Sequence, residues 1–378
     1  MAAEFGPRLR ALLADKGVSM RAAARSLNYD VAYLSRVING RQQPSGQLAM
    51  ALDELLGTDG ELLSLAVPGV PSPAPEHLPG PDSEIARMRT SAACLLDHAD
   101  RHGGDTVAPV AVQVWQSAQR KLDSGEIPEK DQIRYLSAVS EAAEVAGWLL
   151  FDAGKFDSAR AAFLESHMLA RHARDRKMEW FALDMLAMVD IECCRPGETR
   201  RVAEEILSQR RTPPRVALLA RVRRGRALAQ MGDRERALSD FDAARGGLEE
   251  SLTACDPEWA WWVNSCEVTG HSGQALLSLG NSDAAVSDFQ SILQYATPRG
   301  VMLYRAELLR CYAAVKAWRN AEAELEEISA LVDTINSGRN RRMVHQSLKA
   351  IYRESGVPSF LANLADETGN KLRAFEAA

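Results

Sequence analysis

The segment AGWLLFDAGKFDSARAAF (residues 146–163) contains the pattern that organises most of the chain. Gly147 and Ala159 are small residues, spaced as two antiparallel helices need where they approach closely, and Gly154 lies between them at the position of a tight turn. Phe163 follows at the point where an aromatic ring fills the gap to the next helical pair. The segment therefore predicts a helical hairpin and favours an all-α fold for the region around it.

The same frame recurs along the chain, with a small residue near the turn and a larger apolar residue beyond it. The matching positions are Gly225, Gly232, Ala237, Phe241 and Ala244, then Gly273, Gly280, Ala285 and Phe289, and then Tyr312, Trp318, Ala321 and Leu325. A degenerate copy spans residues 183–209, with Gly197 at the turn and Ala203 beyond it. The uneven spacing of the copies predicts longer helices or an insertion near residues 251–264.

This pattern resembles the tetratricopeptide repeat, whose period is about 34 residues. The flanking segments predict two more helical pairs, a first one over residues 83–102 and 106–122 and a C-terminal cap over residues 339–354 and 358–376. The resemblance implies that residues 83–378 form an α-solenoid, whose concave face is built from the first helix of each pair.

The predicted concave face is polar and mixed in charge and carries aromatic residues, which suits a peptide or a small polar ligand. The candidate effector-binding residues on it are Glu144, Trp148, Asp152, Asp184, Arg226, Gln230, Glu267, Gln274 and Arg310. The other interpretation is that these residues are the solvated faces of ordinary helices.

Two further clusters in the repeat region each have two interpretations. Trp259, Trp261 and Trp262 form a tryptophan cluster, which is explained either by core packing or by a stacking wall for a ligand. An arginine-rich stretch is formed by Arg221, Arg223, Arg224 and Arg226. It is explained either by ion pairs with neighbouring acids or by contacts with the DNA backbone. In both clusters we favour the first interpretation.

Residues 7–57 have the pattern of four short helices in a compact bundle. Ser19 and Asp30 have the side chains of N-cap residues, and they precede a second helix over residues 20–27 and a third over residues 31–38. Apolar residues at helical spacing supply the inner faces of the first and fourth helices: Leu9, Leu12, Leu13, Leu48, Ala51, Leu52 and Leu55.

The motif LSRVINGRQQPS (residues 34–45) resembles the signature of the Xre, or lambda-repressor-like, helix-turn-helix family. The resemblance implies that the third helix enters the major groove of double-stranded DNA with its N-terminal residues over base edges. The residues that would face bases are Val31, Ala32, Ser35 and Arg36, and Arg36 could grip guanine with two nitrogens. The residues that would contact phosphate are Ser19, Arg21, Tyr33, Asn39 and Arg41. A bundle that contacts only protein is the alternative.

Charge and composition divide the chain in the same way. Its 378 residues have a net charge of −6, but residues 1–45 hold seven basic and three acidic residues. A basic module on an acidic body is common in DNA-binding regulators. The predicted organisation is a DNA-binding domain over residues 1–66, a proline-rich linker over residues 67–82 and the repeat domain over residues 83–378.

The sequence predicts no catalytic, metal or cofactor site. It lacks the phosphate-binding, dinucleotide-binding, zinc-protease and serine-hydrolase motifs. Cys94, His98 and His102 share a helix face near Asp105, but ordinary packing explains them better than a metal ion does. The six cysteines form no CxxC pair, and neither a secretion signal nor an apolar run of membrane-spanning length is present. We therefore expect a cytoplasmic protein that is not an enzyme.

A lambda-repressor-like domain joined to tetratricopeptide repeats resembles a group of actinobacterial regulators and, more distantly, the signal-peptide-responsive regulators of Gram-positive bacteria. The resemblance implies a sequence-specific transcriptional regulator that forms a homodimer over two operator half-sites and binds a peptide or small-molecule effector in its groove. The competing hypothesis is a protein-interaction adaptor, in which the solenoid docks a protein partner and the helix-turn-helix localises it on DNA.

Overall fold

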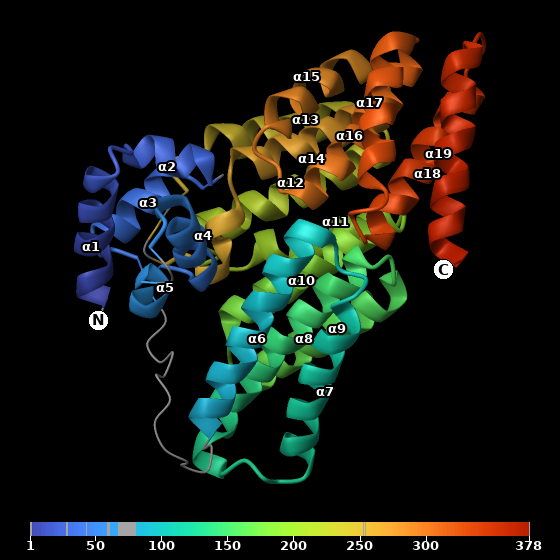
Figure 1. The fold of residues 1–378 in the computed structure, drawn as a ribbon. Coiled ribbons are helices and arrows are strands. Elements are labelled where there is room, and N and C mark those ends of the chain that lie inside the picture. The colour runs from blue at the N-terminus through green and yellow to red at the C-terminus, as the bar shows by residue number, and fades with distance from the viewer. Residues whose placement is uncertain are drawn as a thin grey trace.

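The chain folds into a small N-terminal bundle of helices and a large α-solenoid, which Figure 1 shows side by side. The computed structural model describes residues 2–27, 29–42, 44–58, 61–66, 81–251, 253 and 255–377. Within these residues the regular structure is helical and no strand occurs, so the fold is all-α, as the repeat pattern predicted. No helix among them has both the length and the apolar character that crossing a bilayer requires.

The N-terminal bundle, which we call the head, spans residues 2–66. Its described helices are α1 (Ala2–Asp15), α2 (Met20–Ser26), α3 (Val31–Ile38), α4 (Gly46–Leu56) and α5 (Glu61–Ala66). Side-chain caps begin three of them, because Ser19 Oγ accepts from the Ala22 N–H at 3.1 Å, Asp30 Oδ1 accepts from the Tyr33 N–H at 2.9 Å and Ser45 Oγ accepts from the Leu48 N–H at 3.1 Å. The third predicted helix has the observed bounds, and the second ends one residue early because Leu27 is its C-cap residue.

Apolar residues from all five helices form one core in the head. Its deeply buried members include Phe5, Leu9, Leu34, Leu48, Leu52 and Leu62. α1 crosses α3 so closely that a Cβ on Gly6 would overlap the carbonyl oxygen of Ile38. Arg10 of α1 also donates to the Asn39 side chain at 3.0 Å, at the C-terminal end of α3. The position of α3 is therefore set by packing against α1 as well as by its own cap.

The last two residues of the predicted linker belong to a helix. Residues 67–80 lie outside the described residues. Pro81 and Asp82, which the prediction assigned to the linker, form the first turn of α6 (Pro81–His102). The prediction failed at these two residues because proline is well tolerated in the first turn of a helix, where its missing N–H would have no partner in any case.

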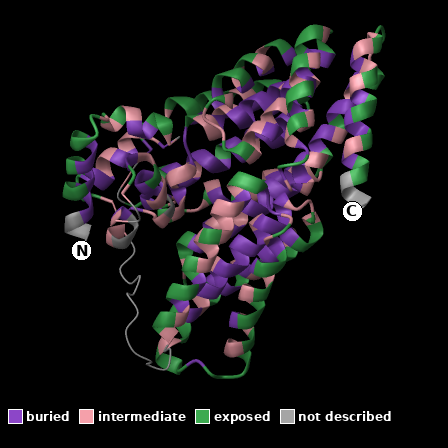
Figure 2. Cartoon of the chain, in the orientation of Figure 1, coloured by how far each residue is buried: buried purple, intermediate pink, exposed green. Residues whose placement is uncertain are grey.

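The solenoid, residues 81–377, is a stack of antiparallel helical pairs. After α6, its helices are α7 (Ala108–Asp123), α8 (Gln132–Asp152), α9 (Phe156–His172), α10 (Arg176–Glu192), α11 (Pro196–Ser208), α12 (Pro214–Gln230), α13 (Arg234–Gly246), α14 (Ser265–Ser278), α15 (Ser282–Leu293), α16 (Pro298–Ala314), α17 (Trp318–Leu331), α18 (Gly338–Arg353) and α19 (Ser359–Ala377). Two short 3-10 helices are η1 (Glu129–Asp131) and η2 (Glu258–Trp262), and η2 occupies the interval where an insertion was predicted. Figure 2 shows that buried residues lie mainly where helices face one another.

Close packing within the pairs follows the predicted positions of small and aromatic residues. A Cβ on Gly147 would come 2.6 Å from the Phe163 ring, and a Cβ on Gly225 would come 2.9 Å from the Phe241 ring. Gly273 faces the Phe289 ring in the same way. In each pair, therefore, the missing side chain of the first helix makes room for the aromatic ring of the second.

The turns inside the pairs use a left-handed residue, which is not always glycine. Gly154, Gly232 and Gly280 have φ angles of 73°, 81° and 74°, as predicted. In the degenerate copy the prediction was wrong, because Cys194 takes the left-handed conformation with φ of 57° and Gly197 lies inside the first turn of α11. A non-glycine residue can hold this conformation when the packed helices on both sides determine it.

The solenoid closes on itself through Asp152, at the end of α8. Its carboxylate accepts hydrogen bonds from the Gly104 N–H at 2.8 Å and from Ser337 Oγ at 3.1 Å. Arg299 of α16 pairs with the same carboxylate at 3.3 Å. These contacts, which we call the closure, join the turn after α6 and the end of α8 to the start of α18 and to α16.

Backbone contacts reinforce the closure. The Asn336 N–H donates to the carbonyl of His102 at 2.6 Å, and the Asp105 N–H donates to the carbonyl of Asn336 at 3.0 Å. A Cβ on Gly103 or on Gly338 would overlap the facing backbone. Glycine at both positions lets the two ends of the solenoid approach within hydrogen-bond distance.

We expect Gly147→Ala to lower the free energy of unfolding by about 1–3 kcal/mol, because the new methyl group would overpack the Phe163 ring. Gly246→Ala in α13 is the matched control, because a Cβ there meets nothing within 4 Å and alanine favours helix more than glycine does. Urea unfolding followed by circular dichroism measures both variants. Equal stabilities would contradict the role assigned to Gly147.

Candidate effector cavity and DNA-binding face

A cavity of about 1670 Å³ lies between the inner face of the solenoid and the head. Its solenoid walls come from α6, α8, α10, η2, α14 and α16, from the turn between α9 and α10, and from Arg223 of α12, Ile292 of α15 and Arg339 of α18. The head contributes Pro44, Ser45, Gly46, Met50, Leu65 and Ala66. Pockets for drug-sized ligands measure roughly 300–1,000 Å³. The cavity therefore has room for a ligand of peptide size, and such a ligand would touch both parts of the chain.

Two neighbouring helices supply one wall of the cavity with side chains at helical spacing. The stripe on α8 consists of Ser137, Glu141, Glu144, Val145 and Trp148. The stripe on α10 consists of Met178, Phe181, Met185 and Met188. The wall thus combines carboxyl groups with aromatic rings and with methionines, whose flexible thioethers adapt to irregular shapes.

The predicted effector-binding residues divide into two groups. Those that line the cavity are Glu144, Trp148, Glu267 and Gln274. Those that do not line it are Asp152, Asp184, Arg226, Gln230 and Arg310. Periodicity indicates which residues share a helix face, but the rotation of that face toward or away from the cavity is set by the neighbouring helices.

The second group belongs to the framework behind the cavity wall. Asp152 forms the closure, and Asp184 holds Arg223 with two hydrogen bonds of 3.0 and 2.9 Å. Gln230 donates to the carbonyl of Ile191 at 3.0 Å. Arg310 pairs with Glu307 at 2.9 Å. Asp152, Asp184 and Gln230 thus bond to groups on other helices, whereas the Arg310 pair lies within α16.

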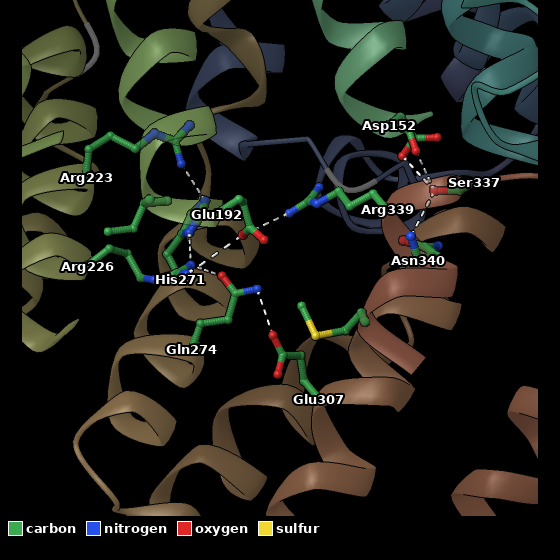
Figure 3. Close-up of polar contacts among 12 residues, drawn as sticks. Asp152, Glu192, Arg223, Arg226, His271, Gln274, Glu307, Ser337, Arg339 and Asn340 are labelled. Carbon is green, nitrogen blue, oxygen red and sulfur yellow. Dashed lines mark hydrogen bonds and ion pairs between the residues drawn. The ribbon is translucent and has the colours of Figure 1, made fainter. Parts of the chain in front are cut away.

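A chain of buried polar groups connects α10, α12, α14, α16 and α18, as Figure 3 shows. Glu192 pairs with Arg226 at 3.9 Å and with Arg339 at 3.5 Å. Gln274 accepts from Arg226 and donates to Glu307 at 3.0 Å. Each charge in this chain has an opposite charge or a hydrogen bond beside it, as buried charges require.

The arginine-rich stretch of α12 forms ion pairs with neighbouring acids, which is the interpretation that we favoured from the sequence. Arg224 and Arg221 both pair with Asp240, at 2.6 and 3.6 Å. Arg223 and Arg226 are buried. In this arrangement the stretch does not offer the DNA backbone a row of free cations.

Glu144 differs from the other buried acids because no hydrogen bond or ion pair of the described residues involves it. It lines the cavity, and 5% of its surface is exposed. Burial raises its pKa to about 8, and the negative charges of Glu141 and Asp184 act in the same direction. At neutral pH the carboxyl group is therefore largely protonated.

The tryptophan cluster of η2 serves two parts of the molecule. Trp259 stacks on Phe181 of α10 at 4.6 Å between ring centroids and donates to the carbonyl of Lys177 at 3.0 Å. Trp261 stacks instead on Tyr29 of the head at 4.7 Å. Trp259, Trp261 and Trp262 all line the cavity. The cluster is therefore a cavity wall that also holds the head.

The N-terminal end of α3 docks on the solenoid. Asp30, the N-cap residue of α3, lies 3.8 Å from Arg215 in the first turn of α12. Arg215 has an exposed fraction of 0%, and its guanidinium nitrogens have no hydrogen-bond partner among the described residues. Burial lowers the pKa of Arg215 and also that of Arg36, whereas the nearby carboxylates of Asp30 and Asp256 oppose both shifts.

The candidate base-reading residues lie beside this contact. Val31, Ala32, Ser35 and Arg36 are half-buried. The guanidinium group of Arg36 donates to Gln42 Oε1 at 3.0 and 2.8 Å. Bound in this way, Arg36 is oriented by the turn after α3, and it would have to leave Gln42 or share it in order to grip a base.

The candidate phosphate-contacting residues differ in exposure. Arg21, Asn39 and Arg41 are exposed, and so is Ser19, whose hydroxyl caps α2. Tyr33 is a correction to the prediction, because only 1% of its surface is exposed and it packs in the core of the head. Its helical position placed it near the DNA-facing side, but the ring turns toward Tyr29, 6.0 Å away between centroids.

Several residues of this region carried no signal in the sequence. Arg215, Arg299 and Arg339 belong to no motif, and their importance follows only from their burial beside acids of distant segments. The tryptophan cluster was the one local sign of the docking contact. It pointed to an aromatic surface but not to the head as its partner.

Comparisons with known proteins agree with both parts of this architecture. Residues 4–66 match a family described as a helix-turn-helix domain. The whole chain is similar in fold to a Rap protein whose crystal structure was solved in complex with competence and sporulation factor, with a TM-score of 0.51, 12% sequence identity, and coverage of 95% of this chain and 94% of that chain. No curated protein matches the chain. The chain thus joins a helix-turn-helix head to a repeat solenoid with a Rap-like fold.

We expect Glu144→Gln to raise the free energy of unfolding by an amount that depends on pH. Below pH 4.5 the carboxyl group is protonated in the folded and the unfolded chain, so the gain is small. Between pH 4.5 and about 8 the unfolded chain loses a proton that the folded chain keeps, so wild-type stability falls as pH rises. The gain grows through this window and then levels off, on the order of a few kcal/mol.

Thermal melts across this pH range measure the effect. Glu326→Gln is the matched control, because Glu326 is exposed on α17, and its melting temperature should follow the wild type at every pH. A stability difference between Glu144→Gln and the wild type that does not change with pH would contradict the raised pKa.

Proposed function

We propose that this protein is a sequence-specific DNA-binding transcriptional regulator, in which an effector bound in the cavity of the solenoid controls the helix-turn-helix head. The observation that carries the proposal is the docking of the N-terminal end of α3. Tyr29 and Asp30, which precede α3, are engaged by Trp261 and Arg215 of the solenoid. The part of the head that would read DNA is therefore the part that the solenoid holds.

A docked α3 is incompatible with insertion into the major groove. Recognition helices of this type reach base edges with their N-terminal residues. The groove is about 12 Å wide, and a helix with its side chains already measures about 10–12 Å across. No room remains for η2 and the first turn of α12 beside the helix. The head must therefore separate from the solenoid before it can read bases.

The docked contact combines favourable and unfavourable contributions. The stack between Tyr29 and Trp261 stabilises it. The burial of Arg215 opposes it, because an ion pair of 3.8 Å without hydrogen bonds compensates poorly for lost hydration. A contact balanced in this way is one that a ligand can displace, provided that its affinity for the docked and released states differs by a few kcal/mol.

The cavity is placed so that its occupant can act on the docked contact. Trp261 lines the cavity and stacks on the head, and Pro44, Ser45 and Gly46 of the head line the same space. A ligand that shifts Trp261 or presses on the turn before α4 would change the stability of the docked state. An effector of this kind would alter DNA binding without touching DNA.

On DNA, we infer that the head acts as a lambda-repressor-like module. Val31, Ala32, Ser35 and Arg36 would face bases, and Ser19, Arg21, Asn39 and Arg41 would contact phosphates. A homodimer would place two heads over half-sites about one helical turn apart. The adaptor hypothesis differs in one respect, because a protein partner and no small ligand or peptide would then change the affinity for DNA.

We expect Arg36→Ala to weaken binding to the preferred DNA sequence by about 1–3 kcal/mol and to relax the preference at one base pair. Arg41→Ala should weaken binding to all sequences alike and reduce the salt dependence. Sequencing of bound genomic fragments identifies the operator, and fluorescence anisotropy at several salt concentrations measures both variants. An unchanged operator affinity of Arg36→Ala would exclude α3 as the reading helix.

We expect Trp261→Ala to raise the affinity for the operator several-fold, because apparent affinity scales with the fraction of chains in the binding-competent state. Trp261→Phe keeps an aromatic ring to stack on Tyr29 and should bind like the wild type. The same anisotropy titration measures both, and circular dichroism verifies that they are folded. If folded Trp261→Ala binds the operator no better than the wild type, the docking contact does not restrain the head.

A further inference from the structure

We propose that the cavity binds a ligand through a positively charged ammonium or guanidinium group, and that Glu144 of α8 is the residue that receives this group. The proposal rests on the proposed function, and it specifies the chemistry of the effector. It is carried by the position of Glu144 in the cavity, by the pairing of the surrounding charges and by the aromatic walls beside it.

Glu144 is a buried acid that faces the cavity. It lies on the same stripe of α8 as Glu141 and Trp148, and all three line the cavity. The side chain is nineteen-twentieths buried, with 5% of its surface exposed, and no described residue bonds to it. The carboxyl oxygens stay open to the cavity but have lost part of their hydration, and no described residue replaces it. A partner from outside the chain, bound in the cavity, would supply what is missing.

Four arginines of the cavity wall are already engaged with other acids, whereas Arg174 and Lys177, beside the start of α10, line the cavity without an ion pair among the described residues. Arg89 donates to Glu141 at 2.8 and 2.7 Å, and Arg223 donates to Asp184 at 3.0 and 2.9 Å. Arg299 pairs with Asp100 at 3.0 Å and with the carboxylate of the closure. Arg339 pairs with Glu192 at 3.5 Å. Glu144 is therefore the buried acid of this wall that has no ion pair or hydrogen bond among the described residues, and its protonated carboxyl group is available to a ligand.

The electrostatic surroundings of Glu144 favour a cation in the same place. The two charges that act on it most, Glu141 and Asp184, are both negative and raise its pKa together with burial. A bound cation would reverse this effect and allow the carboxyl group to ionise. Binding would then form a charge-assisted hydrogen bond inside a region of low dielectric constant, where such bonds are strong.

Aromatic side chains complete the site. Trp148 lies one helical turn from Glu144 on the same stripe, and Phe181 stacks with Trp259 on the adjoining wall. Rings of this kind attract cations and also pack against the apolar stems that carry them. The site therefore suits a cationic group at the end of an apolar stem, such as a lysine or arginine side chain of a peptide or an alkylamine.

The experiment uses the full-length protein and has two arms, because a peptide and a small polyamine share this chemistry. In the first arm, a random hexapeptide pool is incubated with the protein, and the peptides that co-elute with it in size-exclusion chromatography are sequenced by mass spectrometry. In the second arm, spermidine is titrated while the melting temperature is measured. The wild type, Glu144→Gln and the surface control Glu326→Gln are compared in both arms.

We expect the wild type and Glu326→Gln to enrich peptides with Lys or Arg about tenfold over neutral peptides, or to be stabilised by spermidine, and Glu144→Gln to lose that response. A response to peptides alone identifies a peptide ligand, and a response to spermidine alone identifies a small amine. Retention of the response by Glu144→Gln, enrichment of peptides without regard to charge, or the absence of a response in both arms would overturn the proposal.

The outcome is independent of the test of the proposed function. Both arms measure binding to the solenoid in the absence of DNA, whereas the proposed function is tested by the affinity for the operator. A cationic ligand that binds at Glu144 but leaves the affinity for DNA unchanged would support the site and contradict the regulator. If neither arm shows a cation site but the protein still binds its operator, the further inference is contradicted and the proposed DNA-binding function stands.

Discussion

Asp152 joins the two ends of the solenoid, and the arrangement of the large domain follows from that contact. Its buried carboxylate is shared by the turn after α6, the start of α18 and Arg299 of α16. Separating its three partners would leave this carboxylate buried without compensation, which is costly. The cost of that state holds the partners together. Because those partners come from opposite ends of the stack, the closure sets how far the solenoid curves. The size of the cavity and the position of the wall that meets the head depend on that curvature.

Buried charges in this protein differ in how well they are compensated. Asp152 has hydrogen bonds and an ion pair, and it supports the fold. Arg215 has one ion pair of 3.8 Å, and it lies at the contact between solenoid and head. Glu144 has no partner among the residues that the structure describes, and it lines the cavity. Structural charges thus lie where the chain must stay together, whereas poorly compensated ones lie where it would have to open or to bind. The difference in compensation thus links the stability of the closed solenoid to the proposed response to a ligand.

Local features of the fold could be predicted because their causes lie within a few residues or within one helical pair. Ser19 and Asp30 cap α2 and α3 as expected, since a cap needs only a side chain three residues before the N–H that it binds. Gly147 faces Phe163 because the frame of the repeat brings these positions together. The failures have equally local reasons. Pro81 starts a helix, although the prolines that precede it in the sequence led us to assign it to the linker. Cys194 takes the turn conformation that was expected near Gly197.

By itself, the sequence determined the all-α class, the helix-turn-helix head, the series of helical pairs and the residue types on their faces, because periodicity and capping act over short distances. Tertiary structure alone decided which of those faces meet. Ser337 and Asp152 are separated by 185 residues, and no local pattern encodes their contact. It results from the small rotation between successive pairs, added up over the whole stack. The same accumulated rotation brings Trp261 to Tyr29, and it turns Glu144 toward the cavity and Asp184 away from it.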